Sequence, residues 1–173
     1  DVVQFVPGPP MDTSVSLRIG CVLSGGQAPG GHNVISGLFD WIKANATGSD
    51  SGLFGFLDGP QGIYNGSYIE IFKERMSLYR NQGGFDMIGA GRHKIHGRQF
   101  DQALKVAKKL RLDGIVVIGG DDSNTNAAML GEYFQKEGCG CVVVGVPKTI
   151  DGDLKLPAVG LETSFGFDTA CKC

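Results

Sequence analysis

The sequence has no apolar run close to the roughly 18 residues that a membrane-spanning helix needs. It also has no excess of basic residues. Sixteen lysines and arginines against 18 aspartates and glutamates give a net charge of −2 and a pI of about 5.9. This balance disfavours a nucleic-acid groove as the main function. We therefore expect a protein that binds neither membranes nor nucleic acid.

Cysteine and histidine are too sparse, and too poorly spaced, for a typical zinc site. Cys139/Cys141 and Cys171/Cys173 each form a C-x-C pair, without further ligands at zinc-finger spacing. None of the three histidines is four residues from another. An odd count of five cysteines, in a sequence without a signal peptide, fits a reducing compartment and predicts a cytoplasmic location.

Glycine is abundant, with 28 among 173 residues, and 42% of the residues are hydrophobic. That apolar content is enough for one globular domain with its own core. The glycines fall in short loops after apolar runs, where the backbone turns sharply or approaches a ligand. The composition thus predicts a ligand-binding globular domain.

The pattern along the chain predicts an α/β fold. Residues 1–17 hold three prolines and no clear periodicity, which indicates an extended arm or linker before a domain at 18–173. Strands are expected at 18–23, 53–57, 68–71, 85–88, 115–118 and 141–146, and helices at 32–46, 73–79, 99–110, 126–136 and 162–173. Apolar strands alternating with amphipathic helices predict a parallel sheet with helices on both faces. Ligands of such sheets bind beyond the carboxyl ends of the strands.

The loop SGGQAPGG at 24–31 is the first candidate for a phosphate site, because it joins a strand to a helix and exposes backbone N–H groups. It nearly matches a P-loop. However, His32 and Asn33 stand where Lys and Ser or Thr are required, so that interpretation fails. A plain strand-to-helix connection is the alternative.

GGDDSNT at 119–125 follows the next apolar strand. One Asp or Ser there is expected to cap a helix, but a single cap does not need two adjacent aspartates. An aspartate at a strand end beside bound phosphates is well placed to hold Mg²⁺. The motif therefore points to a phosphate donor.

GRHKIHGR at 91–98 is strongly basic. A solvated loop is one interpretation. Arg92 directly follows a predicted short strand and Gly-Ala-Gly, so Arg92 alone of this group is expected to face the strand-end cleft.

PKTIDGD at 147–153 follows the strand predicted at 141–146, which is expected to be buried, and carries two carboxylates around Gly152. One of them, Asp151 or Asp153, can accept the proton of an attacking hydroxyl, which typically contributes about 10²–10⁴-fold. The other can orient it. Lys148 supplies a point charge for a phosphate oxygen.

Five segments together resemble the phosphofructokinase family, most closely its pyrophosphate-dependent branch: LSGGQAPGGHNVI, YRNQGGFD, IGGDDSNTNAA, PKTIDGDLK and SFGFDTACK. The resemblance covers nearly everything from Arg18 to Lys172. It implies two α/β domains with the active site between them, this chain being the first. It also implies a reversible, Mg²⁺-dependent transfer from pyrophosphate to the C1 hydroxyl of fructose 6-phosphate, a glycolytic step, in a homo- or hetero-oligomer.

Residue by residue, the resemblance assigns diphosphate binding to Gly25 and Gly26, Mg²⁺ to Asp121, and the transferred phosphoryl to Arg92. It assigns the base on the C1 hydroxyl to Asp151, with Thr149 against the sugar phosphate.

The resemblance makes Asp153 the partner of the base. Asp122 and Lys148 stand where the ATP-using branch has glycine, and so indicate pyrophosphate. Asp122 is expected to exclude the adenosine-bearing phosphate by volume and charge, and Lys148 to neutralise the leaving phosphate.

Two alternatives stay open: an ATP-dependent phosphofructokinase, which Asp122 argues against, and a non-catalytic module that senses phosphate or nucleotide. The carboxylates that a similar non-catalytic plant-type subunit loses are intact here, which favours the catalytic type. The chain ends at Cys173, before the family's Met-Gly-Arg motif and its basic residues for the sugar phosphate. We therefore expect the chain alone to be inactive, since orientation of the reactants contributes about 7–11 kcal/mol of the reaction barrier.

Overall fold

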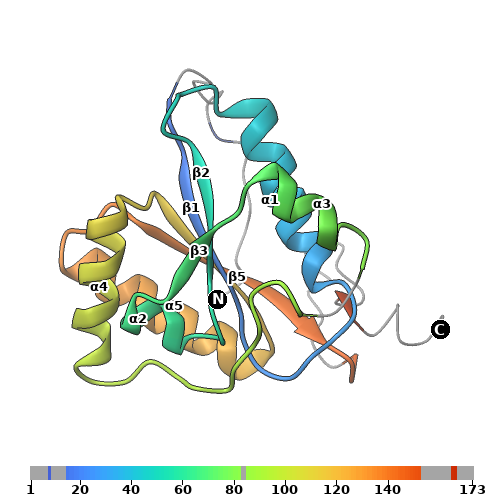
Figure 1. The fold of residues 1–173 in the computed structure, drawn as a ribbon. Coiled ribbons are helices and arrows are strands. Elements are labelled where there is room, and N and C mark those ends of the chain that lie inside the picture. The colour runs from blue at the N-terminus through green and yellow to red at the C-terminus, as the bar shows by residue number, and fades with distance from the viewer. Residues whose placement is uncertain (1–7, 9–14, 83–84, 153–164, 167–173) are drawn as a thin grey trace.

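The computed structural model describes residues 8, 15–82, 85–152 and 165–166, and they form an α/β layered structure around one sheet (Figure 1). The six strands lie in the order β3-β2-β1-β4-β5-β6. Their bounds are Arg18–Leu23 (β1), Gly52–Phe56 (β2), Tyr68–Glu70 (β3), Gly114–Gly119 (β4), Val142–Thr149 (β5) and Phe165–Gly166 (β6). All pair in parallel except the edge strand β3, which is antiparallel to β2. The predicted α/β class is confirmed, with one antiparallel edge.

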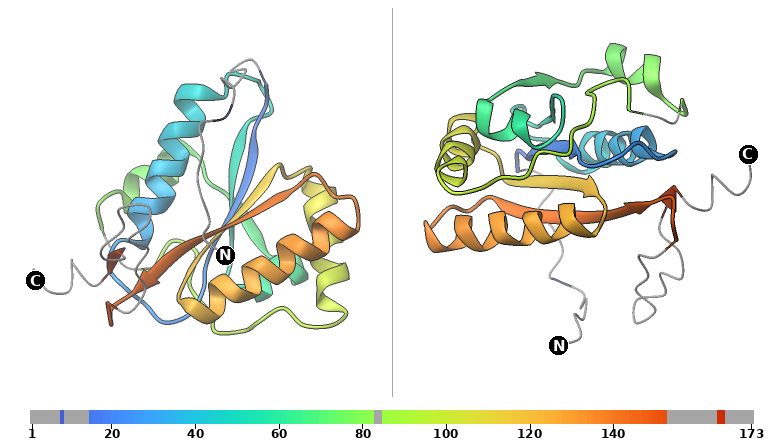
Figure 2. Two further views of the ribbon diagram at one scale, coloured as in Figure 1. Left: turned by 180° about the vertical axis from the view of Figure 1, so that it is seen from behind. Right: turned by 90° about the horizontal axis from the view of Figure 1, so that it is seen from below.

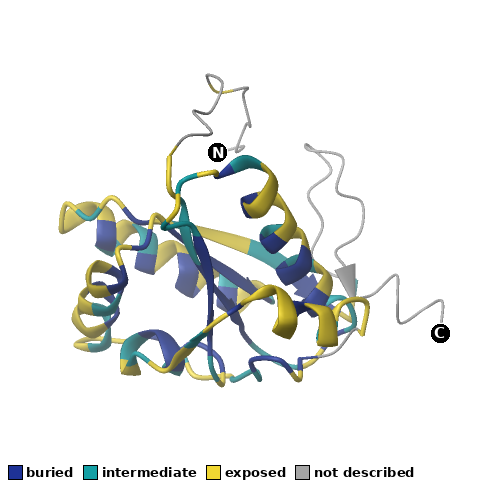
Figure 3. Cartoon of the chain, turned by 45° about the horizontal axis from the view of Figure 1, so that its top comes forward, coloured by how far each residue is buried: buried dark blue, intermediate teal, exposed yellow. Residues whose placement is uncertain are grey.

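Helices cover both faces of the sheet, as expected for strands that are apolar throughout. On one side lie α1 (Gly31–Asn45) and α3 (Lys73–Tyr79). On the other lie α2 (Gln61–Asn65), α4 (Gln99–Leu110) and α5 (Asp121–Lys136), as Figures 1 and 2 show. Figure 3 shows β1, β2 and β4 mostly buried and exposed residues on the outward faces of the helices. Strand β5, which was expected to be buried, is exposed or half-buried from Val142 to Pro147.

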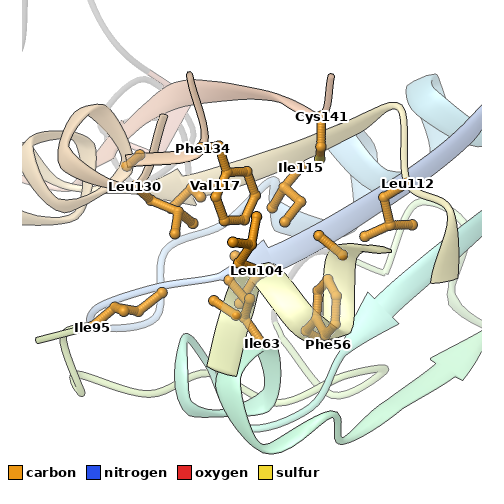
Figure 4. Packing of buried hydrophobic residues seen from close by; sticks show 14 of the residues in the cluster. Phe56, Ile63, Ile95, Leu104, Leu112, Ile115, Val117, Leu130, Phe134 and Cys141 are labelled. Atoms are coloured by element: carbon orange, nitrogen blue, oxygen red, sulfur yellow. The ribbon is translucent and has the colours of Figure 1, made fainter. Parts of the chain in front are cut away.

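Two apolar clusters hold these layers together. Helix α4 has apolar residues at helical spacing, and its buried face packs with β1, β2, β4 and α5 (Figure 4). Members of this first cluster include Phe56, Ile63, Ile95, Leu104, Val117, Leu130 and Phe134. The second cluster, under α1 and α3, includes Cys21, Leu23, Ile35, Phe39, Met76, Phe85 and Ile118.

Two elements predicted from the sequence are wrong, because a short apolar stretch indicated a strand and a polar stretch indicated a loop. The apolar stretch 85–88 is not a strand. It forms a turn closed by the Gly89 N–H on the Phe85 carbonyl at 2.8 Å, and its apolar side chains are buried there. The predicted loop GGDDSNT is mostly helix, since α5 begins at Asp121 rather than Asn126. Two carboxylates in the first turn suit the positive end of a helix dipole.

Other differences concern the ends of the chain and of the strands. Strand β5 continues to Thr149, three residues past the predicted end. The helix predicted for 162–173 is wrong at Phe165–Gly166, which form β6, and its other residues lie outside the described part. The predicted arm 1–17 also lies mostly outside it. Helix α2 was not predicted. In the described part of the chain, no helix has the length and apolarity that crossing a membrane requires.

Candidate active site

A cleft lies beyond the carboxyl ends of β1, β4 and β5, where a parallel sheet is expected to bind its ligand. Its volume is about 460 Å³. Four sequence segments that are far apart in the chain meet there. The lining residues are Ser24, Gly25, Gly26, Gln27, Arg92, Lys94, Gly120, Asp121, Asp122, Ser123, Lys148, Thr149, Ile150 and Asp151.

The glycine loop after β1 is tied into the sheet at its start. The Ser24 N–H donates to the Ile118 carbonyl at 2.8 Å, and the Gly25 N–H donates to the Gly91 carbonyl at 2.9 Å. Gly25 has φ +92°, a left-handed conformation that favours glycine. A side chain at Gly26 would stand 3.3 Å from the Arg92 guanidinium. The loop therefore presents bare backbone to the cleft.

The first turn of α5 carries the two adjacent carboxylates. Neither acts as a side-chain cap, because the N-cap is Gly120. The Asn124 amide instead donates to the Gly119 and Gly120 carbonyls at 2.8 and 2.7 Å. Ser123 is also drawn inward, with its hydroxyl 2.8 Å from that of Ser24. Asp121 and Asp122 line the cleft, and both are exposed there.

The basic segment contributes two residues rather than the one predicted. Arg92 lines the cleft as expected, and so does Lys94. The Lys94 ammonium pairs with the Asp122 carboxylate at 2.7 Å. His96 and Arg98 are exposed and are not among the lining residues. The sequence signal for Lys94 was its position two residues after Arg92, which puts both on one side of an extended segment.

Lys148 is the penultimate residue of β5 and lines the cleft. Its side chain is almost fully buried, at 5% exposure, and its ammonium donates to the Gly26 carbonyl. The Phe85 ring centroid lies 5.7 Å from the nitrogen. Burial lowers the pKa of Lys148 below its ordinary value. The nearby charge of Arg92 lowers the pKa further, and Asp151 partly opposes this. The site holds a partly desolvated cation that links β5 to the glycine loop.

Thr149 and Asp151 lie beside Lys148 in the same wall of the cleft. The two-residue pairing of β5 with β6 holds the backbone at Lys148 and Thr149. The Asp151 N–H then donates to the Thr149 hydroxyl at 3.0 Å, which shapes the turn that follows the strand. Asp151 lines the cleft and is exposed. Asp153, the predicted second carboxylate, lies outside the described residues.

The carboxylates of the cleft suit a hard metal cation that takes most of its ligands from phosphate and water. Magnesium is usually held by one or two carboxylates together with substrate phosphates. Asp121 offers one such carboxylate, whereas Asp122 is paired with Lys94. No cluster of three or more acidic, histidine or cysteine side chains able to hold a metal occurs among the residues that the structure describes. Asp121 with a bound phosphate therefore fits a magnesium ion.

A backbone-lined loop, three cations and three carboxylates in one cleft are the parts of a phosphoryl-transfer site. The family whose description is Phosphofructokinase matches residues 18–173. This chain belongs to that family.

Named relatives are similar over nearly the whole chain. It is 60% identical to "Pyrophosphate--fructose 6-phosphate 1-phosphotransferase subunit beta 2" of Arabidopsis thaliana, over 90% of this chain and 27% of that protein. It is 57% identical to "Pyrophosphate--fructose 6-phosphate 1-phosphotransferase" of Treponema pallidum (strain Nichols), over 94% of this chain and 28% of that protein. The chain thus spans less than a third of the length of these relatives.

A solved structure supports the fold. The T-state phosphofructokinase of Pichia pastoris superposes with a TM-score of 0.74 over 97% of this chain and 20% of that one. Its sequence identity is 20%, so this likeness bears on the fold alone.

Proposed function

We propose that this chain forms the phosphoryl-donor half of the active site of a Mg²⁺-dependent phosphotransferase. The enzyme transfers a phosphoryl group from pyrophosphate to the C1 hydroxyl of fructose 6-phosphate, giving fructose 1,6-bisphosphate and phosphate in a reversible step of glycolysis. The observation that carries this proposal is the single cleft that brings the glycine loop, the Asp pair, Arg92 and the end of β5 together. The names of the relatives supply the substrates.

Pyrophosphate binds between the glycine loop and the start of α5. The backbone of Gly25 and Gly26 follows the phosphates, and no side chain there fills the space. Arg92 lies 3.3 Å from the position of a side chain at Gly26, so its guanidinium can reach the phosphoryl group that is transferred.

Asp121 would hold the magnesium ion, which would supply positive charge to neutralise and orient the phosphate oxygens. Asp121 fits this role because its carboxylate lines the cleft, while the N-terminus of α5 beside it can bind the phosphate that shares the ion.

Lys148 neutralises the leaving phosphate. Its ammonium is fixed by the Gly26 carbonyl and is nearly excluded from water, where a charge acts more strongly than in solvent. A fixed cation of this kind needs no rearrangement as charge builds on the leaving oxygen.

Asp151 is the base that accepts the proton of the C1 hydroxyl, and Thr149 contacts the sugar phosphate. Support comes from their common wall of the cleft and from the hydrogen bond that sets the turn between them. Asp153 is proposed as the partner of the base from the sequence alone.

A second domain or chain completes the sugar-phosphate site, beside the domain at 18–173. The greater length of the relatives supports this. The enzyme is proposed to be cytoplasmic and oligomeric, and the Arabidopsis relative's name as a beta subunit supports the assembly.

The test of this function is the Asp151→Ser variant of the full-length protein. Loss of the base should lower kcat by at least about 10²-fold, with binding of pyrophosphate and sugar retained. Glu132→Gln, an exposed carboxylate change on α5, is the matched control and should leave kcat unchanged. If Asp151→Ser raises KM while kcat stays near wild type, Asp151 is not the base.

A further inference from the structure

Lys94 lines the cleft, but neither the sequence motifs nor the proposed mechanism assigns a role to it. Its ammonium lies 2.7 Å from the Asp122 carboxylate at the cleft, with side-chain exposures of 39% and 74%. Ion pairs this exposed contribute little to stability, because water screens both charges. The effect of this pair should therefore be sought in the ligand that enters the cleft.

Two hydrogen bonds of the buried Asn126 side chain hold the segment that places Lys94 beside Asp122. Asn126 lies one helical turn after Asp122 on α5, on the same face. Its amide accepts from the Ile95 N–H and donates to the Ile95 carbonyl, both at 2.9 Å, and Asn126 is buried. The Ile95 side chain is anchored in the first apolar cluster (Figure 4). These contacts hold the residue before it, Lys94, over the first turn of α5.

The position of Lys94 affects the balance of charge in the cleft, and therefore the binding of an anion. Its basic lining residues are Arg92, Lys94 and Lys148, and its acidic ones are Asp121, Asp122 and Asp151. These formal charges cancel. A pyrophosphate anion beside an unpaired Asp122 would be repelled, and removal of Lys94 alone would leave the lining with a net negative charge.

We propose that Lys94 is a positioning residue for donor selection: it holds Asp122 at the cleft and offsets its charge. Asp122 then limits the donor by its volume. A compact pyrophosphate is accepted without repulsion, while a longer polyphosphate chain meets the fixed side chain. This inference rests on the proposed function, since it concerns the donor of that same site.

Steady-state kinetics of four variants of the complete protein test this role. Lys94→Met keeps the length of the side chain and removes its charge, so KM for pyrophosphate should rise about tenfold, with kcat changing less than about twofold. Lys94→Arg should restore KM to within about threefold of wild type, since it keeps the charge. Lys105→Met, an exposed lysine change on α4, is the control and should alter neither constant.

The fourth variant combines Lys94→Met with Asp122→Asn, which removes both charges and keeps the volume. Its KM for pyrophosphate should return to within about threefold of wild type, and ATP should stay excluded. If KM stays as high as in Lys94→Met, Lys94 contacts the donor directly and the proposal is wrong. An unchanged KM in Lys94→Met, or ready use of ATP by the double variant, also overturns it.

Failure of the proposed function would look different. Wild-type protein would then not turn over fructose 6-phosphate with pyrophosphate at all. Charge compensation between Lys94 and Asp122 can still be measured in that case, as the affinity for pyrophosphate in calorimetry with Mg²⁺ present. The same order of affinities among the variants supports the role of Lys94, and equal affinities refute it.

Discussion

Replacing Lys148 with Met should separate catalysis from stability. The change removes a cation that is 5% exposed and whose ammonium donates to one carbonyl, that of Gly26. Loss of that hydrogen bond, whose donor is charged, costs about 1.5–3 kcal/mol net. Against it, a thioether near the Phe85 ring contributes about 0.3–1.5 kcal/mol, and the desolvation cost of the buried charge disappears. The free energy of unfolding should therefore stay the same or rise.

Catalysis should respond in the opposite sense. Loss of one fixed group that stabilises developing charge lowers kcat by about 10²–10³-fold. The assays are pyrophosphate-dependent turnover of fructose 6-phosphate and thermal unfolding of the same complete protein. A large drop in Tm with kcat near wild type would show that Lys148 holds the loop in place and does not serve the leaving phosphate.

Three further outcomes are expected. Burial lowers the pKa of Lys148 below its ordinary value of 10.5, so Lys148 loses its charge at a lower pH than free lysine does. We therefore expect kcat to fall as the pH rises through the pKa of Lys148 in the folded protein. A kcat that stays constant up to pH 10.5 contradicts this. Gly119→Ala places a Cβ 2.4 Å from that of Ser123, so denaturant unfolding should show a loss of about 1–3 kcal/mol. Asn126→Ala leaves the Ile95 backbone without its buried partner, costs about 1–3 kcal/mol in the same assay, and should raise KM for pyrophosphate through Lys94.

Much of the sheet could be predicted because its strands are unambiguous. The run at β4 is apolar and buried at every position, and α4 has the helical spacing of apolar residues that fixed its bounds correctly. The turn at Phe85 could not be predicted in this way. A short apolar stretch is buried equally well as a strand or as a turn, and only tertiary contacts decide.

The cleft was predictable as a set of loops, but its connections were not. Asp121 and Asp122 looked like loop residues because Asp, Ser and Asn favour caps and turns. In the structure the helix begins at Asp121, with the Asn124 N–H donating to the Gly120 carbonyl at 2.9 Å and both carboxylates at the positive end of the helix dipole. The pairing of Lys94 with Asp122, like the hydrogen bond of Ile95 with Asn126, joins segments that lie far apart in sequence.

The central claim is that this cleft takes pyrophosphate as its donor, and the choice of donor tests it most directly. The measurement is kcat/KM for phosphoryl transfer to fructose 6-phosphate by the complete wild-type protein, with pyrophosphate and with ATP, at saturating Mg²⁺. The account predicts turnover with pyrophosphate and scarcely any with ATP, and Asp122→Gly, which removes the volume of the side chain, should admit some ATP. Turnover with ATP equal to that with pyrophosphate would contradict it.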